Sequence, residues 1–173
     1  MNRRRQTLWV SIGGVVAMAL YAGLGLLQLL VLTPLAAAPG RSLDEIRAEL
    51  SAAGESLNDV VPVVFLSVGV LIALVGAVVA VRARAHPAIP AMVFLSLLML
   101  GAPVLFHMSF LPGMALADTY MIGGGVMLRG MLPFYAVSAF AGVLLLAGVV
   151  VASIRTRAAT RAQEASAAAS VTY

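Results

Sequence analysis

The sequence predicts an all-α integral membrane protein with four transmembrane helices. It is 62% hydrophobic and only 10% charged, with a mean hydropathy of +1.04, whereas soluble domains average about 25% charged residues. It also contains four apolar runs of about 20 residues, the length needed to cross the hydrocarbon of a bilayer. Arginines stand at the ends of these runs, as membrane anchors do. We therefore expect one membrane domain over residues 1–157 and a flexible tail over residues 158–173.

The first predicted span covers residues 8–32 and follows a basic start, Arg3 to Arg5. A signal peptide is the alternative, because three alanines at 36–38 follow the apolar run. Signal-peptide apolar regions are about 7–15 residues long, and this run is much longer, so an uncleaved span is favoured. Thr33-Pro34 and Pro39-Gly40 are expected to break the helix.

Residues 41–59 form the one long polar stretch between apolar runs and hold five of the seven acidic residues. Ser42 and Glu45 have the spacing of a capping box at a helix start. We therefore predict a short amphipathic helix over residues 42–57, whose acidic polar face is unlike the basic faces that bind anionic lipid. Its apolar stripe, at helical spacing, comprises Leu43, Ile46, Leu50, Ala53 and Leu57.

Three further spans follow. The second, over residues 63–81, starts after Pro62, which suits a first helical turn. The third, over residues 91–111, contains Pro103, which is expected to kink it. The fourth covers residues 133–154. Arginine pairs at 82 and 84 and at 155 and 157 end the second and fourth spans.

Residues 112–132 are apolar but interrupted by Gly123, Gly124, Gly125 and Gly130. We predict that Pro112-Gly113 ends the third span and that an apolar loop follows on the rim of the bundle. Partial re-entry into the membrane is the alternative, and it would need protein or water to satisfy the backbone.

Two ion pairs are expected outside the spans. Asp118 and Arg129 share the predicted loop, where a pair between them would pin it. Arg47 follows Asp44 by three residues, within reach on one helix face.

The distribution of charge predicts the orientation. Eight of the eleven arginines lie at the N-terminus, in the link after the second span and in the C-terminal tail. The positive-inside rule then places both termini in the cytoplasm and the amphipathic helix outside. The arginine-only basic composition, with much Ala, Val, Leu and Gly, is typical of a GC-rich bacterial genome. We therefore expect a multi-pass protein of the bacterial cytoplasmic membrane.

Two sequence patterns concern helix packing. The segments 62–67 and 133–138 place Pro and Ser alike, which fits either an internal repeat of two hairpins or convergence on good span starts. Small residues at four-residue spacing let helices approach closely, and they occur at Gly13 and Ala17, at Gly69, Ala73 and Ala77, and at Gly148 and Ala152.

The spans carry no Asp, Glu, Lys or Arg in their middle parts, which argues against an ion-coupled pump. Their interior polar residues are Gln28, Ser67, Ser96 and Ser138. These residues are expected to form hydrogen bonds within the bundle. An oligomeric channel or uncoupled transporter is the alternative function, and it needs a water-accessible path past Gln28, Ser67 or Ser138.

No enzyme, cofactor or metal site is predicted. The chain has no cysteine and nothing that matches a phosphate loop, a dinucleotide turn or a zinc motif. A further alternative is an outward-facing Cu(I) site, since thioether and imidazole ligands suit that ion. Its candidate ligands are His107, Met108, Met114, Met121, Met127 and Met131.

The leading hypothesis is a non-enzymatic accessory or scaffold subunit in the lipid bilayer. It binds another membrane protein or a second copy of itself, and no nucleic acid. Apolar residues of the amphipathic helix would pack on the partner or on the bundle, and its acids would steer the partner. The candidate surface comprises Leu43, Glu45, Ile46, Glu49, Leu50, Met114, Met121 and Met127.

Overall fold

The computed structural model describes the backbone of residues 3–123 and 125–171, and the side chains of these residues except 125–128, 159 and 162–171. Within this part of the chain every regular element is a helix. Four helices are long and apolar enough to cross a membrane: Arg3–Ala37, Val60–Arg82, Ala88–Tyr120 and Arg129–Ala158. The predicted all-helical class with four membrane-length helices is confirmed.

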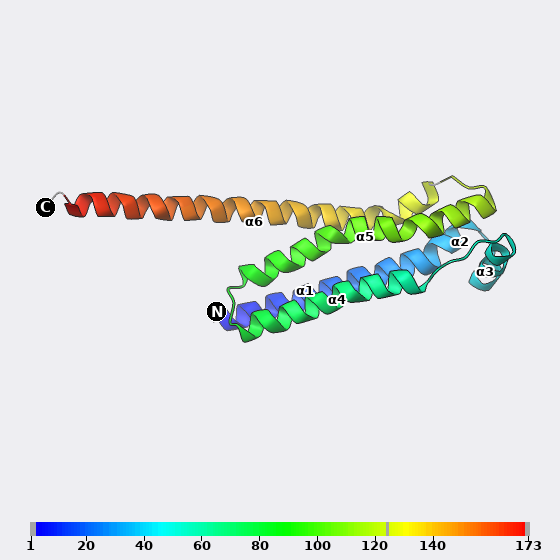
Figure 1. Ribbon diagram of the computed structural model, residues 1–173, viewed down its shortest axis with the longest axis horizontal. Coiled ribbons are helices and arrows are strands. Elements are labelled where there is room, and N and C mark those ends of the chain that lie inside the picture. Colours follow the sequence, from blue (N-terminus) through cyan, green and yellow to red (C-terminus); the bar gives the residue numbers. More distant parts are fainter. Residues whose placement is uncertain (1–2, 124, 172–173) are drawn as a thin grey trace.

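The helices form an elongated bundle (Figure 1). The elements are α1 Arg3–Leu27, the π-helix η1 Gln28–Leu32, α2 Thr33–Ala37, α3 Leu43–Ala52, α4 Val60–Arg82, α5 Ala88–Tyr120 and α6 Gly125–Val171. The main contacts join α1 to α4, α1 to α5, α4 to α5 and α5 to α6. Thus α6 is held mainly by α5, with further contacts to α2 and η1.

The two ends of the bundle differ in character. The N-terminus, the α4–α5 link and the C-terminal part of α6 lie toward one end, and α3 lies at the other (Figure 1). We call the first the arginine end, because Arg3, Arg4, Arg5, Arg82 and Arg84 are there, and the second the α3 end. At the arginine end the Thr7 hydroxyl donates a hydrogen bond to the Ala85 carbonyl at 2.8 Å, which ties the link to α1.

The first helix does not end at Thr33-Pro34, so that prediction is wrong. Because Pro34 has no N–H, an ordinary helical turn would leave a carbonyl without its donor. Just before Pro34 the chain widens into η1, in which the Thr33 N–H donates to the Gln28 carbonyl. The helix then continues through α2 to Ala37. A π-turn is a known way to absorb a disturbance in the hydrogen-bond ladder. The turn at Gly40, with φ +84°, completes the break.

The predicted loop over residues 112–132 is also largely helical. α5 runs on through Pro103 and Pro112 to Tyr120, so the predicted end at Pro112-Gly113 is wrong. Prolines are tolerated inside membrane helices where neighbours satisfy the freed groups. Figure 1 shows α5 bending along its length, the usual effect of proline.

α6 contains 47 residues, about 70 Å at 1.5 Å per residue, so it is far longer than a bilayer core of about 30 Å. It includes Gly130 and Pro133, and it continues to Val171. The segment predicted to be a flexible tail is thus helical as far as Val171. Figure 1 shows this helix continuing alone past the arginine end.

Glycines allow α1 and α5 to approach each other closely. A Cβ at Gly14 would collide with the Phe94 ring, and one at Gly101 would lie 2.5 Å from the Tyr21 ring. Of the small-residue stripes, the one in α4 packs, with Ala73 buried against Met18 and Phe94. Gly13 and Gly148 face open space instead, so those two pairs do not mark close contacts.

Candidate partner-binding surface

α3 forms because its first turn is capped. The Ser42 hydroxyl accepts a hydrogen bond from the Glu45 N–H at 3.3 Å, and the Ser42 N–H donates to the Glu45 carboxylate at 2.7 Å. The predicted capping box is confirmed. The Ser42 N–H and, second, the Ser42 hydroxyl, which donates to the same carboxylate at 3.0 Å, lower the pKa of Glu45 below its ordinary value. The helix ends at Ala52, short of the predicted Leu57, because Gly54 adopts φ +82° and turns the chain away.

The apolar stripe of α3 packs on its own chain. Ile46 and Leu50 are 0% and 1% exposed and lie in one cluster with Ala115 and Leu116 of α5. Leu57 packs against the same cluster. α3 is therefore a cover over α2 and the last turns of α5. Of the other stripe positions, Leu43 is half-buried and Ala53 is exposed.

Charged groups fix α3 on two sides. The Oε1 atom of Glu49 lies 3.1 Å from the Nη1 atom of Arg41. Its Oε2 atom accepts a hydrogen bond from the Tyr120 hydroxyl at 2.8 Å, which ties α3 to the end of α5. Arg47 lies 2.7 Å from Asp59, just before α4, so its partner is not Asp44 as the spacing suggested. Glu49 is thus committed to its own chain, whereas Glu45 presents an exposed carboxylate beside its cap.

The opposite side of α5 is uncovered. Phe110, Leu111, Met114 and Met121 are 55%, 75%, 50% and 91% exposed. At 100° per residue these four positions fall within about 100° of arc. We call these four residues the α5 face. Neither Phe110 nor Leu111 was among the predicted site residues, although their spacing to Met114 was a readable signal.

The α5 face lies level with the start of α4 and extends beyond it. His107, Met108, Leu111 and Pro112 of α5 line a cavity of about 370 Å³ together with Val61 and Pro62 in the first turn of α4. The next two turns of α5 therefore continue past the level at which α4 begins. Figure 1 shows α5 reaching farther toward the α3 end than α4 does.

Met121 occupies a costly backbone conformation. It ends α5 in the left-handed region, with φ 53°, where glycine is the usual residue. A side chain there costs about 1–2 kcal/mol. Residues in strained backbone conformations cluster at functional sites. Met121 combines such a conformation with a large, almost wholly exposed apolar side chain.

The predicted methionine cluster is divided. Met108 and Met131 are buried with Leu29 in the core, whereas Met114 and Met121 belong to the α5 face. The side chain of Met127 lies outside the described residues. His107 is exposed beside the cavity that Glu55 and Asn58 also line. Among the described residues, no three His, Cys, Asp or Glu side chains are grouped as metal ligands would be.

Asp118 and Arg129 are both exposed. The ion pairs among the described side chains are Arg41–Glu49 and Arg47–Asp59. The structure therefore does not bring Asp118 and Arg129 together as the pair that the sequence suggested.

The interior polar residues serve mainly as helix contacts. The Ser138 hydroxyl donates to the Leu98 carbonyl at 2.7 Å and lies 2.9 Å from the Tyr21 hydroxyl, which links α6, α5 and α1. Ser96 donates to a carbonyl of its own helix. Gln28 donates to Thr33 at 3.2 Å and lies against Gly130, where a Cβ would collide with its amide. Ser67 is exposed on the side of α4, in an apolar groove against α1.

Comparison with protein-family models, with curated proteins and with solved structures finds no match to this chain.

Proposed function

We propose that this chain is a non-enzymatic accessory or scaffold subunit that binds another membrane protein through the α5 face. The observation that carries the proposal is the apolar exposure of α5 at and beyond the first turn of α4. Exposed apolar side chains within the hydrocarbon are covered by lipid and need no partner. Where a helix leaves that layer, a contiguous apolar surface is characteristic of a protein contact.

The depth of the bundle supports this placement. α4 has 23 residues, about 35 Å, so it nearly matches the hydrocarbon core with its interfaces. α5 has 33 residues, about 50 Å, and its excess lies largely at the α3 end. Here α3 covers Ala115 and Leu116, and the side with Met114 and Met121 is left for the partner.

The partner is expected to present an apolar ridge with few acidic groups. Asp118 is exposed beside the α5 face, and Glu45 is exposed on α3. Such charges mainly steer and select a partner, whereas buried apolar contact supplies most of the affinity.

Site-specific crosslinking tests this proposal. A photoreactive residue at Leu111 or Met114 should give a discrete adduct with a second membrane protein in intact membranes. The matched control is Leu146, which is 67% exposed on α6 and should give only lipid adducts. In the chain labelled at Leu111, M114D should remove the adduct while leaving expression and thermal unfolding unchanged.

Two results would overturn the proposal. One is that Leu111 and Met114 label only lipid, as Leu146 does. The other is that the chain is recovered from mild detergent as a monomer under all conditions, with no adduct. An adduct that joins two copies of this chain would show that the α5 face binds a second copy and not another membrane protein.

The arrangement of polar residues favours this function over the channel alternative. Ser138 is buried and engaged, Gln28 is packed against α6, and Ser67 lies on the outer side of α4. A path past these residues within one copy would have to break those contacts.

A further inference from the structure

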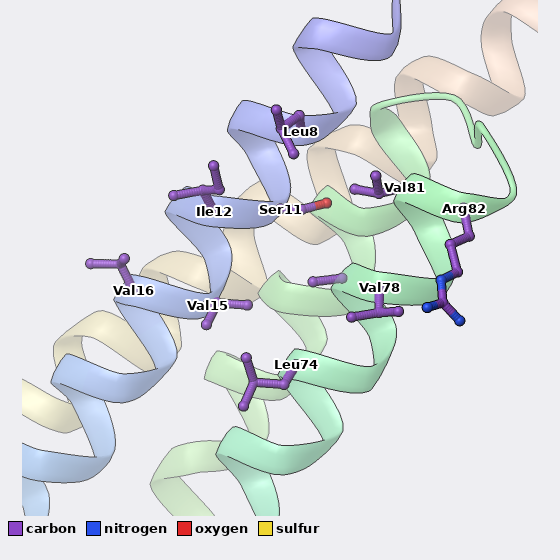
Figure 2. Close-up of a pocket in the computed structure, with 10 residues that line it drawn as sticks. Leu8, Ser11, Ile12, Val15, Val16, Leu74, Val78, Val81 and Arg82 are labelled. Carbon is purple, nitrogen blue, oxygen red and sulfur yellow. The ribbon is translucent and has the colours of Figure 1, made fainter.

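A groove runs between α1 and α4 at the arginine end of the bundle (Figure 2). Its volume is about 510 Å³, and its lining is apolar except at two positions, Ser11 and Arg82. From Leu74 to Arg82 it follows two turns of α4, about 12 Å. That is close to the depth of one leaflet in a hydrocarbon core of about 30 Å. The length of the groove along α4 is therefore slightly less than the thickness of one leaflet.

The Ser11 side chain is an unusual part of this lining. It is only 2% exposed, and its hydroxyl has no hydrogen-bond partner among the described residues. Figure 2 shows this hydroxyl directed from α1 toward α4. A buried hydroxyl without a partner costs about 1–3 kcal/mol, so a polar atom of a bound molecule at this position would stabilise the protein.

Positive charge is concentrated at the mouth of the groove. Arg82 lines the groove itself. A second hollow of about 340 Å³ adjoins it, sharing Leu8 and Val81 and lined by Arg4 and Arg5. Among the described side chains, the ion pairs recorded involve none of these three arginines. Arg4 and Arg5 therefore stand at the polar end of the groove, and the Arg82 guanidinium lies along α4 beside Val78 (Figure 2).

We propose that this groove is a binding site for one anionic phospholipid. An acyl chain lies between Leu8, Ile12 and Val16 of α1 and Leu74 and Val78 of α4. The Ser11 hydroxyl donates a hydrogen bond to a glycerol-ester carbonyl. The guanidinium groups of Arg4, Arg5 and Arg82 bind the phosphate. Basic pockets between membrane helices bind anionic headgroups in this way.

The same face of the helix pair continues the groove inward. Ala19, Gly23 and Leu26 of α1 and Ser67 and Leu71 of α4 line a further hollow of about 380 Å³. Positions 12, 16, 19, 23 and 26 follow one another at intervals of three and four on α1, and 67, 71, 74, 78 and 81 do so on α4. The end of a long acyl chain therefore has an apolar path toward the middle of the bundle.

Native mass spectrometry of the full chain in detergent tests this site with two lipids that share acyl chains, a phosphatidylglycerol and a phosphatidylcholine. The wild-type chain should retain one phosphatidylglycerol in preference to phosphatidylcholine. R82Q should reduce that preference about fivefold, the equivalent of about 1 kcal/mol for one arginine, and R4Q/R5Q should reduce it further. R155Q/R157Q is the matched control, because these exposed arginines lie on α6, and it should leave the preference unchanged.

Replacing Ser11 separates the two parts of the site. S11A should lower the retention of both lipids alike, because both carry ester carbonyls. Equal retention of the two lipids by the wild-type chain would overturn the proposal, as would an equal effect of R82Q and R155Q/R157Q. Inorganic phosphate at millimolar concentration should neither displace the lipid nor raise the unfolding temperature as phosphatidylglycerol does. If it did so, the site would be one for free phosphate.

Discussion

Neighbouring glycines in α1 have opposite surroundings. A Cβ on Gly14 would collide with the ring of Phe94, whereas Gly13 has no heavy atom within 4 Å of that position. Phe94 is itself buried beside Met18 and Ala73, so its ring has little room to move. Gly14 is therefore a packing requirement, and Gly13 is not.

We expect G14A to destabilise the bundle by about 1–3 kcal/mol, the usual cost of overpacking a tight contact. G13A should be neutral or stabilising by up to about 1 kcal/mol, because alanine favours the helix more than glycine does. Thermal unfolding in one detergent compares the two variants. Equal unfolding temperatures for G13A and G14A would contradict the role assigned to Phe94.

Glu45 gives the cap of α3 a defined pH dependence. Its pKa is lowered, first by the Ser42 N–H and then by the Ser42 hydroxyl. Because the ionised form is the one that caps the helix, the stabilisation is complete above the ordinary value of 4.5. It is lost as the pH falls through the lower pKa of the folded state.

Carboxyl NMR of the protein labelled at glutamate measures this pKa directly. The wild-type Glu45 should titrate below 4.5, and S42A should move its pKa upward, since the variant loses the hydroxyl donor. A wild-type pKa at or above 4.5 would show that the capping box does not form in solution.

At the scale of elements, α3 is held by two buried side chains and a small polar network. Ile46 and Leu50 seat its apolar stripe, and Glu49 connects it to Arg41 and Tyr120. A helix of 10 residues is too short to be stable alone in water. Its order therefore depends on this docking.

We predict that L50A releases α3. Removing most of a buried leucine costs about 2 kcal/mol or more, which raises the open population about 30-fold. Trypsin should then cut the chain after Arg47 about 30-fold faster. The cleavage rate follows the population of undocked α3 when α3 redocks faster than trypsin cuts. A53S changes an exposed position of the same stripe and should leave the rate unchanged. Rapid cleavage of the wild-type chain would contradict the docked arrangement.

The sequence predicted the elements better than their ends. Hydropathy and arginine flanks located all four membrane-length helices, and the Ser42–Glu45 spacing located the start of α3. Helix breaks were predicted at Pro34, Pro112 and Gly130, but the chain stays helical through all three. Proline and glycine are more frequent inside membrane helices than inside soluble ones. In membrane helices these residues are tolerated, because neighbouring helices and local π-turns accommodate them.

The candidate surface was predicted only in part. The stripe spacing identified Ile46 and Leu50 as a contact face, but a pattern in one helix does not say whether the contact is with its own chain. Of the α5 face, Met114 and Met121 were predicted, whereas Phe110 and Leu111 were not, because a helix end was expected at Pro112. Without that end, Phe110, Leu111 and Met114 are visible as one side of a helix.

At the scale of the whole molecule, the two hairpins are less alike than their sequences. Ser67 and Ser138 occupy matching positions after Pro62 and Pro133. Yet Ser67 is exposed and Ser138 is buried, and Pro62 is buried whereas Pro133 is exposed. α4 packs chiefly with α1 and α6 with α5, which is the same pairing within each hairpin, so the difference lies in the surroundings of the individual residues. The resemblance is therefore no guide to a shared binding role.

Charge is distributed unequally between the two ends of the bundle. The arginine end carries the arginine triplet of α1 and the pair around the α4–α5 link, and the α3 end carries five acidic residues between positions 44 and 59. Short arginine-rich segments are retained in the cytoplasm, so we expect the arginine end to face inward. Both the proposed lipid site and the termini would then be cytoplasmic, and the α5 face would be external.

Because the chain has no cysteine, single substitutions report this orientation directly. Ser56 and Ala83 are both exposed, one in the α3–α4 link and the other just after α4. In intact cells a membrane-impermeant thiol reagent should label S56C, and it should label A83C only after the membrane is opened. The reverse pattern would invert the bundle. It would place the α5 face in the cytoplasm and confine the search for its partner to proteins exposed there.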